Sequence, residues 1–237
     1  MITKEQYNKL LEVMKEHMQL DDYGWYNISN IYFDTPSFLL IRNSLDKPNY
    51  KEKLRVRSYG AVTDDQKVFI EIKKKYDGVV YKRRITTTKK QAFDYLVKGK
   101  ELAKPSQISK ELDYLLEHYE NLEPAVFLAY EREGYFGNVD PELRVTFDHN
   151  IRMRNYDISL SKENYGDRIL DENLVLLEVK TPTGLPFWLV NFFSENKIYK
   201  ASFSKYGTGY KKFILPKMIE ELHEASNDLE FRKLDAS

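Results

Sequence analysis

The chain alternates between apolar and charged residues over five stretches, in the manner of β-strands. In the segment 51–57 all four odd positions carry Lys or Arg. Successive side chains of a strand point to opposite faces, so these four bases share one face. The segment 68–73 divides in the same way, with apolar residues opposing Glu71 and Lys73. The pattern therefore predicts a sheet that collects cations on one face.

The segments 143–148 and 174–180 also divide into an apolar and a charged face. The second of them places Glu178 and Lys180 near the end of an otherwise apolar strand, where a charge is costly unless it is paired or bound to a ligand. Alternation alone is equally typical of a sheet with one solvent-exposed face. The large apolar residues opposite the bases favour helices on that side, with the charged face inside a closed or strongly curved sheet.

Helical periodicity and turn signals complete the predicted order of elements. The segment 3–6 has the spacing of a capping box, and apolar residues then recur at helical period, which predicts a first helix of about four to five turns. Asp77-Gly78 predicts a hairpin between two alternating segments. The other predicted helices cover 89–98, 107–119, 186–194 and 216–225. The predicted strands cover 27–33, 51–59, 67–75, 79–87, 125–133, 142–148 and 173–180. Since no linker or repeat interrupts this order, residues 1–237 are predicted to form a single α+β domain.

The distribution of charge adds more than the total charge does. The 37 Lys and Arg residues balance the 37 Asp and Glu residues, so the net charge predicts no partner. Between residues 47 and 90, however, 14 Lys or Arg residues face 5 Asp or Glu residues, an excess of 9 positive charges. A focused positive potential in a cleft attracts polyanions even when the whole protein is neutral.

Several classes of protein are excluded or disfavoured by what the sequence lacks. The absence of cysteine excludes disulfides and thiolate metal sites. No apolar run approaches the roughly 18 residues of a membrane span, and no signal peptide opens the chain, so a soluble cytoplasmic protein without membrane insertion is expected. The sequence has no Gly-rich phosphate loop and no metal-binding His pair, and His149 is predicted to lie in a turn.

Any catalytic chemistry is therefore expected to come from Arg, Lys and Glu side chains. That set suits phosphoryl transfer, in which positioning and charge neutralisation do most of the work. A carboxylate among the bases would recruit Mg²⁺ or Mn²⁺, which take oxygen ligands and bridge phosphates.

A set of short motifs follows in a fixed order along the chain. The set comprises Ser29-Asn30-Ile31-Tyr32-Phe33-Asp34-Thr35, Lys53-Leu54-Arg55-Val56-Arg57, Phe69-Ile70-Glu71-Ile72-Lys73, Val80-Tyr81-Lys82-Arg83-Arg84, Tyr130-Glu131-Arg132, Leu143-Arg144-Val145-Thr146-Phe147-Asp148, Leu177-Glu178-Val179-Lys180 and Ser202-Phe203-Ser204-Lys205-Tyr206-Gly207. In this order, over residues 1–213, the chain resembles the VTC domain, the catalytic domain of polyphosphate polymerases within the triphosphate tunnel metalloenzymes. The resemblance implies an antiparallel β-barrel of about eight strands around a basic tunnel, with helices outside. It also implies synthesis of inorganic polyphosphate from ATP with Mn²⁺ or Mg²⁺, on a polyphosphate or pyrophosphate acceptor and without nucleic acid.

The resemblance also implies roles for individual residues. Those expected to line the tunnel and act in catalysis are Arg55, Arg57, Lys73, Arg132, Arg144 and Lys205. Those expected to bind substrate beside them are Lys53, Lys82, Arg84 and Lys180. The alternation of the segment 79–87 places Lys82 and Arg84 inward. Glu178 is implied as the metal ligand, and Glu71 points inward either as a second ligand or as the partner in an internal ion pair.

The resemblance further implies one more strand before the first helix, which contributes a tunnel lysine. Met1-Ile2-Thr3 falls where that strand ends, so the domain is expected to lack it. Two other functions stay open: a metal-dependent tripolyphosphatase or nucleoside triphosphatase of the same superfamily, and a non-catalytic polyphosphate-binding module. The usual Glu-x-Glu-x-Lys strand of the first is missing. Grooves for single-stranded nucleic acid interleave aromatic residues among the bases, whereas the inward faces of the most basic strands here carry few aromatic residues, which favours bare phosphate.

Overall fold

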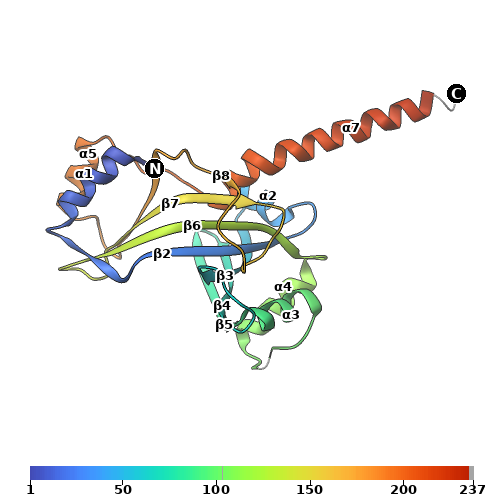
Figure 1. Ribbon diagram of the computed structural model, residues 1–237, viewed down its shortest axis with the longest axis horizontal. Coiled ribbons are helices and arrows are strands. Elements are labelled where there is room, and N and C mark those ends of the chain that lie inside the picture. The colour runs from blue at the N-terminus through green and yellow to red at the C-terminus, as the bar shows by residue number, and fades with distance from the viewer. Residues whose placement is uncertain (103, 235–237) are drawn as a thin grey trace.

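The architecture is an antiparallel sheet surrounded by helices, described from a computed structural model that covers residues 1–102 and 104–234 (Figure 1). The strands are β1 (Ile2–Thr3), β2 (Met18–Asp34), β3 (Tyr50–Tyr59), β4 (Lys67–Tyr76), β5 (Val79–Thr88), β6 (Glu123–Gly137), β7 (Arg144–Arg154), β8 (Asp167–Arg168) and β9 (Leu174–Lys180). The helices are α1 (Lys4–Met14), α2 (Leu39–Leu45), α3 (Lys89–Lys98), α4 (Gln107–His118), α5 (Phe187–Glu195), α6 (Lys205–Gly209), the π-helical turn η1 (Tyr210–Ile214) and α7 (Leu215–Leu234). The predicted α+β class is confirmed.

The sheet is open, whereas a closed barrel was predicted. The strand order is β1-β9-β7-β6-β2-β3-β4-β5, with β8 added to β7, and among the described residues the two edges β1 and β5 do not pair with each other. Strand β1 contributes only Ile2 and Thr3 to β9, because the Thr3 side chain already caps α1 and the chain turns into that helix at Lys4. In Figure 1, β3 to β5 cross beneath β2, β6 and β7 at a steep angle. The result is a curved sheet with an inner and an outer face.

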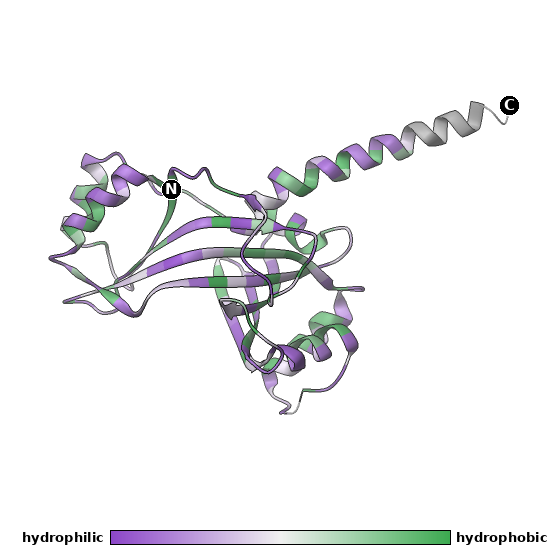
Figure 2. Ribbon diagram, in the orientation of Figure 1, coloured by the Kyte–Doolittle hydropathy of each residue, from purple (hydrophilic) through white to green (hydrophobic). Residues whose placement is uncertain are grey.

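Helices cover the outer face, as the apolar halves of the strands predicted. Over β3 and β4, Leu54, Val56 and Ile70 form one core with residues of α3 and α4. Over β7 and β9, a second core joins Phe147 and Val175 to residues of α1 and α5. Burial of these apolar side chains is the main stabilising term of such layers. The helices around the sheet carry both hydrophobic (green) and hydrophilic (purple) residues in Figure 2, as expected of helices with one buried face.

Part of the inner face is also a core, which the alternation did not predict. Ile28, Leu128 and Ile151 pack there against Tyr206 of α6 and Tyr210 of η1. The short elements α2, α6 and η1 were missed because none is long enough to show a helical period. They fill the inner face beside β2, β6 and β7, so the charged part of this face is confined to the remaining surface.

Most predicted boundaries agree with the observed elements, with a few differences. Helix α1 has 11 residues, about three turns and shorter than predicted. His149 lies within β7 and not in a turn, because β7 continues to Arg154 along β6.

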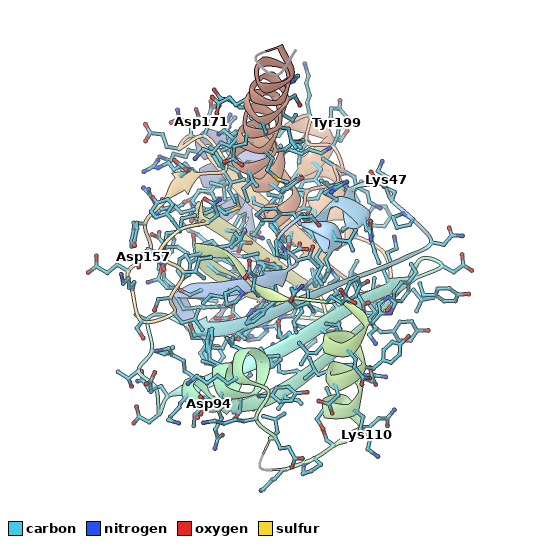
Figure 3. All side chains as sticks on the ribbon, turned by 90° about the vertical axis from the view of Figure 1, so that its right-hand side faces the viewer. Lys47, Asp94, Lys110, Asp157, Asp171 and Tyr199 are labelled. Atoms are coloured by element: carbon cyan, nitrogen blue, oxygen red, sulfur yellow. The ribbon has the colours of Figure 1, made fainter. Side chains whose placement is uncertain are left out.

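Helix α7 projects from the body, and the view turned by 90° looks along it (Figure 3). None of the helices in the described part of the chain combines the length and apolar character needed to cross a membrane.

Candidate functional site

A row of three lysines crosses the inner face of β3, β4 and β5. Lys53 lies opposite Lys73, and Lys73 lies opposite Lys82, in the antiparallel register. Directly opposite residues have Cβ atoms about 5 Å apart, and like charges at such positions are destabilising. Burial lowers the pKa of Lys53, and the charge of Lys73 lowers it further. Burial likewise lowers the pKa of Lys82. We call these three residues the lysine row.

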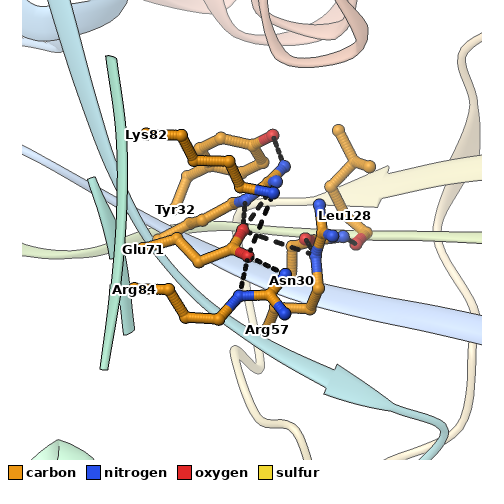
Figure 4. A network of polar contacts seen from close by, with 8 residues as sticks. Asn30, Tyr32, Arg57, Glu71, Lys82, Arg84 and Leu128 are labelled. Carbon is orange, nitrogen blue, oxygen red and sulfur yellow. Dashed lines mark hydrogen bonds and ion pairs between the residues drawn. The ribbon is translucent and has the colours of Figure 1, made fainter. Parts of the chain in front are cut away.

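The next row along the same strands is centred on a buried carboxylate (Figure 4). The side chain of Glu71 is 2% exposed and contacts Arg55 Nη2 at 2.7 Å, Arg57 Nε at 3.6 Å and Lys82 Nζ at 3.4 Å. Arg84 donates to it from Nε at 2.8 Å. Burial alone would raise the pKa of Glu71, but Arg55, Arg57 and Lys82 outweigh that effect and lower it from 4.5 to about 2. Four cations around one carboxylate leave an excess of three positive charges. We call this group the Glu71 centre.

Two guanidinium groups of the Glu71 centre are held by further hydrogen bonds. Arg55 Nη1 donates to the Tyr32 hydroxyl at 3.0 Å, and Arg57 Nε donates to Asn30 Oδ1 at 3.2 Å. Asn30 is itself fixed, because its amide donates to the carbonyl of Leu128 at 3.1 Å. A guanidinium has five N–H donors in a rigid fork, so groups fixed in this way can still offer donors to an anion.

A second cluster lies on β6, β7 and β9 and includes the first residue of α6. Asp148 is fully buried and accepts from Arg132 Nε at 2.5 Å and Nη2 at 2.7 Å, while Lys205 Nζ lies at 2.5 Å. Glu178 lies 3.7 Å from Arg132 and 3.8 Å from Lys205. Burial raises the pKa of Asp148, but Arg132 and Lys205 reverse the shift and hold it below its ordinary value. Two cations thus balance two carboxylates in this group, the Asp148 centre.

The carboxylates fit a metal ion that arrives with a phosphate better than a metal ion bound by protein alone. No group of three His, Cys, Asp or Glu side chains with metal-binding geometry occurs among residues 1–102 and 104–234. Mg²⁺ and similar ions are commonly bound through one or two carboxylates plus substrate phosphates. Glu178 is 39% exposed and can offer such a carboxylate, whereas the oxygens of Glu71 are occupied by four cations. The arrangement therefore supports the ion-pair alternative for Glu71.

The structure places the other two expected site residues at a distance from the Glu71 centre. Arg144 and Lys180 lie opposite each other on β7 and β9, one same-face row beyond Glu178. Both side chains are exposed, and Arg144 lies 4.0 Å from Asp21. They can contact only a ligand that extends past Glu178.

Three residues of the site were not predicted. Asn30 and Tyr32 share the inner face with Arg57 and Arg55, as the alternation of the segment 27–33 could have shown once its pairing with β3 was known. Asp148 shares a face with Arg144 by strand parity, but its pairing with Arg132 depends on a register irregularity between Ala129 and Glu131. Sequence patterns do not reveal such a bulge.

The protein thus combines an open antiparallel sheet, helices on its outer face and a cationic inner face. The VTC domain family matches residues 1–214, and the chain belongs to that family. No curated protein matches the chain.

Two solved structures resemble the protein over most of its length. The first is a "putative adenylate cyclase" from Bacillus halodurans, with a TM-score of 0.56, 13% identity and coverage of 90% of this chain and 93% of that chain. The second is a "putative adenylyl cyclase" from Hippeastrum that is described as having a dominant triphosphatase activity, with a TM-score of 0.52, 15% identity and coverage of 91% and 94%. At these identities the likeness concerns the fold alone.

Proposed function

We propose that the protein is a polyphosphate polymerase that transfers the γ-phosphoryl group of ATP to the end of an inorganic polyphosphate chain. The observation that carries the proposal is the lysine row beside the Glu71 centre. Like charges repel at these positions, the Glu71 centre alone has an excess of three positive charges, and a strongly anionic ligand would relieve this repulsion. Membership of the VTC family supports the choice of ATP and polyphosphate.

The proposed reaction needs little proton chemistry from the protein. The terminal oxygen of a polyphosphate chain is already anionic, so it can attack the γ-phosphorus while the bond to the β-phosphate oxygen breaks and ADP leaves. The main obstacle is repulsion between two anions, and fixed cations in a site of low dielectric constant reduce it. Arg55, Arg57 and Arg84 would orient the phosphates, and the lysine row would hold the chain.

A divalent cation would add charge neutralisation on the phosphate oxygens when it is bound. Glu178 would hold it, with the phosphates supplying further oxygen ligands. Lys205 and Arg132 lie within 4 Å of this carboxylate and would keep it oriented.

The test is a synthesis assay with purified protein, ATP and Mn²⁺, with and without a pyrophosphate or short polyphosphate primer. The products are separated on a gel stained for polyphosphate. A ladder that disappears on chelation is the expected result. Tight, salt-sensitive binding of polyphosphate without any ladder would instead identify a binding module.

A metal-dependent tripolyphosphatase or nucleoside triphosphatase is the second candidate. Lys82 and Arg84 are partly exposed at the open edge strand β5, so water can reach the cations there. The Hippeastrum protein of the same fold is described as a triphosphatase. The same assay separates the two candidates, because hydrolysis releases free phosphate and lengthens no chain.

A further inference from the structure

A row of aromatic side chains continues the inner face beyond the Glu71 centre. Phe69 lies opposite Arg57 in register, and Tyr59 follows Arg57 by two residues, so both share the face of the cations. The ring centroids of Tyr59 and Phe69 are 5.8 Å apart, and those of Tyr59 and Tyr26 are also 5.8 Å apart. We call Tyr26, Tyr59 and Phe69 the aromatic row. Among the described residues of the basic strands β3 and β4, only Tyr59 and Phe69 are aromatic residues on the inward face, so these are few, as expected, but they gather at one end.

The exposure of Tyr59 distinguishes it from a core residue. Tyr59 is 51% exposed, although it contacts the rings of Tyr26 and Phe69. Both contacts are edge-to-face, with interplanar angles of 65° and 80°. Such contacts leave part of the ring surface of an exposed residue available to a planar ligand. Exposed apolar surface beside a polar site is typical of a binding surface.

The aromatic row is continuous with the phosphate-binding cations. The guanidinium carbon of Arg84 lies 4.6 Å from the ring centroid of Phe69, and the same guanidinium contacts Glu71. Along β3, the step from Arg57 to Tyr59 is about 7 Å. A ligand that places several phosphates on the cations and a planar ring on Tyr59 has the chemistry of a nucleoside triphosphate.

We propose that Tyr59, supported by Tyr26 and Phe69, is the subsite for the nucleobase of the nucleotide donor. This inference rests on the proposed function, because it requires the triphosphate of the donor to bind the Glu71 centre. Stacking on an aromatic ring is tolerant of base identity, since every base has a π-face. The subsite therefore favours nucleotides over bare tripolyphosphate and discriminates little between ATP and GTP.

The test compares two ligands that differ in the nucleoside. Binding of a non-hydrolysable ATP analogue and of tripolyphosphate is measured by calorimetry for the wild type, Tyr59→Ala and Tyr59→Phe. Loss of one stacking partner is expected to weaken binding of the ATP analogue about tenfold in Tyr59→Ala. Tripolyphosphate should bind all three proteins within about twofold, and Tyr59→Phe should retain the affinity for the analogue. The matched control is Tyr114→Ala, which removes a tyrosine that is 64% exposed on α4.

The outcomes separate this inference from the proposed function. Unchanged binding of the analogue by Tyr59→Ala would overturn the nucleobase subsite and leave phosphate binding intact. An equal loss of affinity for both ligands would also overturn the nucleobase subsite, because Tyr59 would then act through the phosphate site or the fold. Failure of the wild type to bind either ligand would overturn the proposed function itself.

Discussion

Replacement of Glu71 by Gln tests whether the Glu71 centre is a site of compensated charge. The variant keeps the size of the side chain and an oxygen acceptor but removes the only negative charge among Arg55, Arg57, Lys82 and Arg84. The fold should therefore lose stability when no anion is present. It should also bind polyanions more tightly, because the excess positive charge rises from three to four.

The size of the loss follows from two independent arguments. A pKa lowered from 4.5 to about 2 corresponds to about 3 kcal/mol of stabilisation of the charged form. Removing one partner from a buried ion pair costs about 3 to 5 kcal/mol. We therefore expect Glu71→Gln to lower the free energy of unfolding by about 3 kcal/mol at pH 7, or Tm by about 6 to 12 °C for a chain of this length.

The assay is urea unfolding of the wild type and Glu71→Gln, with and without tripolyphosphate. A tenfold gain in affinity would return about 1.4 kcal/mol of the loss at saturating ligand. Because the folded-state pKa of Glu71 lies below its unfolded value, the contribution is present above pH 4.5 and lost as the pH falls toward about 2. The wild type should therefore lose more stability than the variant across this window. The control is Glu172→Gln, an exposed carboxylate paired with Arg168.

A variant as stable as the wild type would refute the reasoning, since the negative charge of Glu71 would then not be needed to stabilise the four cations around it. An equal gain from tripolyphosphate in both proteins would refute the link between the charge excess and anion binding.

Three further substitutions test the site. Arg55→Ala should reduce turnover about 100- to 1000-fold in the polyphosphate gel assay, because it removes a fixed hydrogen-bond donor, while the circular dichroism spectrum stays unchanged. Turnover at the wild-type rate would contradict a role of Arg55 in the site. Lys73→Gln should raise the stability of the free protein by up to about 1 kcal/mol, since it relieves repulsion in the lysine row. The same substitution should weaken tripolyphosphate binding and make that binding less dependent on salt. Glu178→Gln should raise the Mn²⁺ concentration needed for half-maximal activity but leave metal-free tripolyphosphate binding unchanged; an unaltered Mn²⁺ requirement would remove Glu178 from the metal site.

Strand parity predicted most of the Glu71 centre because the period of a strand is two. Once the segments 51–57, 68–73 and 79–87 are taken as strands, a shift of one residue would move their apolar residues from the core to the charged face. The alternation therefore fixed the shared face of Arg55, Glu71 and Arg84 without knowledge of the fold.

The Asp148 centre could not be found in this way, because it depends on contacts between distant segments. Lys205 lies at the start of a helix of five residues and reaches Asp148 from a separate part of the chain. Whether the sheet closes is likewise decided by its two edge strands, β1 and β5, which are far apart in the sequence. The alternation within one strand does not show with which other strand it pairs.

The two centres differ in charge balance, and this difference assigns them different roles in the proposed reaction. The Asp148 centre is neutral, so Arg132 and Lys205 are held in place without a ligand. The Glu71 centre and the lysine row carry excess positive charge, and a ligand anion would relieve their repulsion. Binding free energy is therefore expected to come mainly from β3 to β5. The half-exposed carboxylate of Glu178, oriented by the balanced centre, is the group that would position a metal ion at the reacting phosphate.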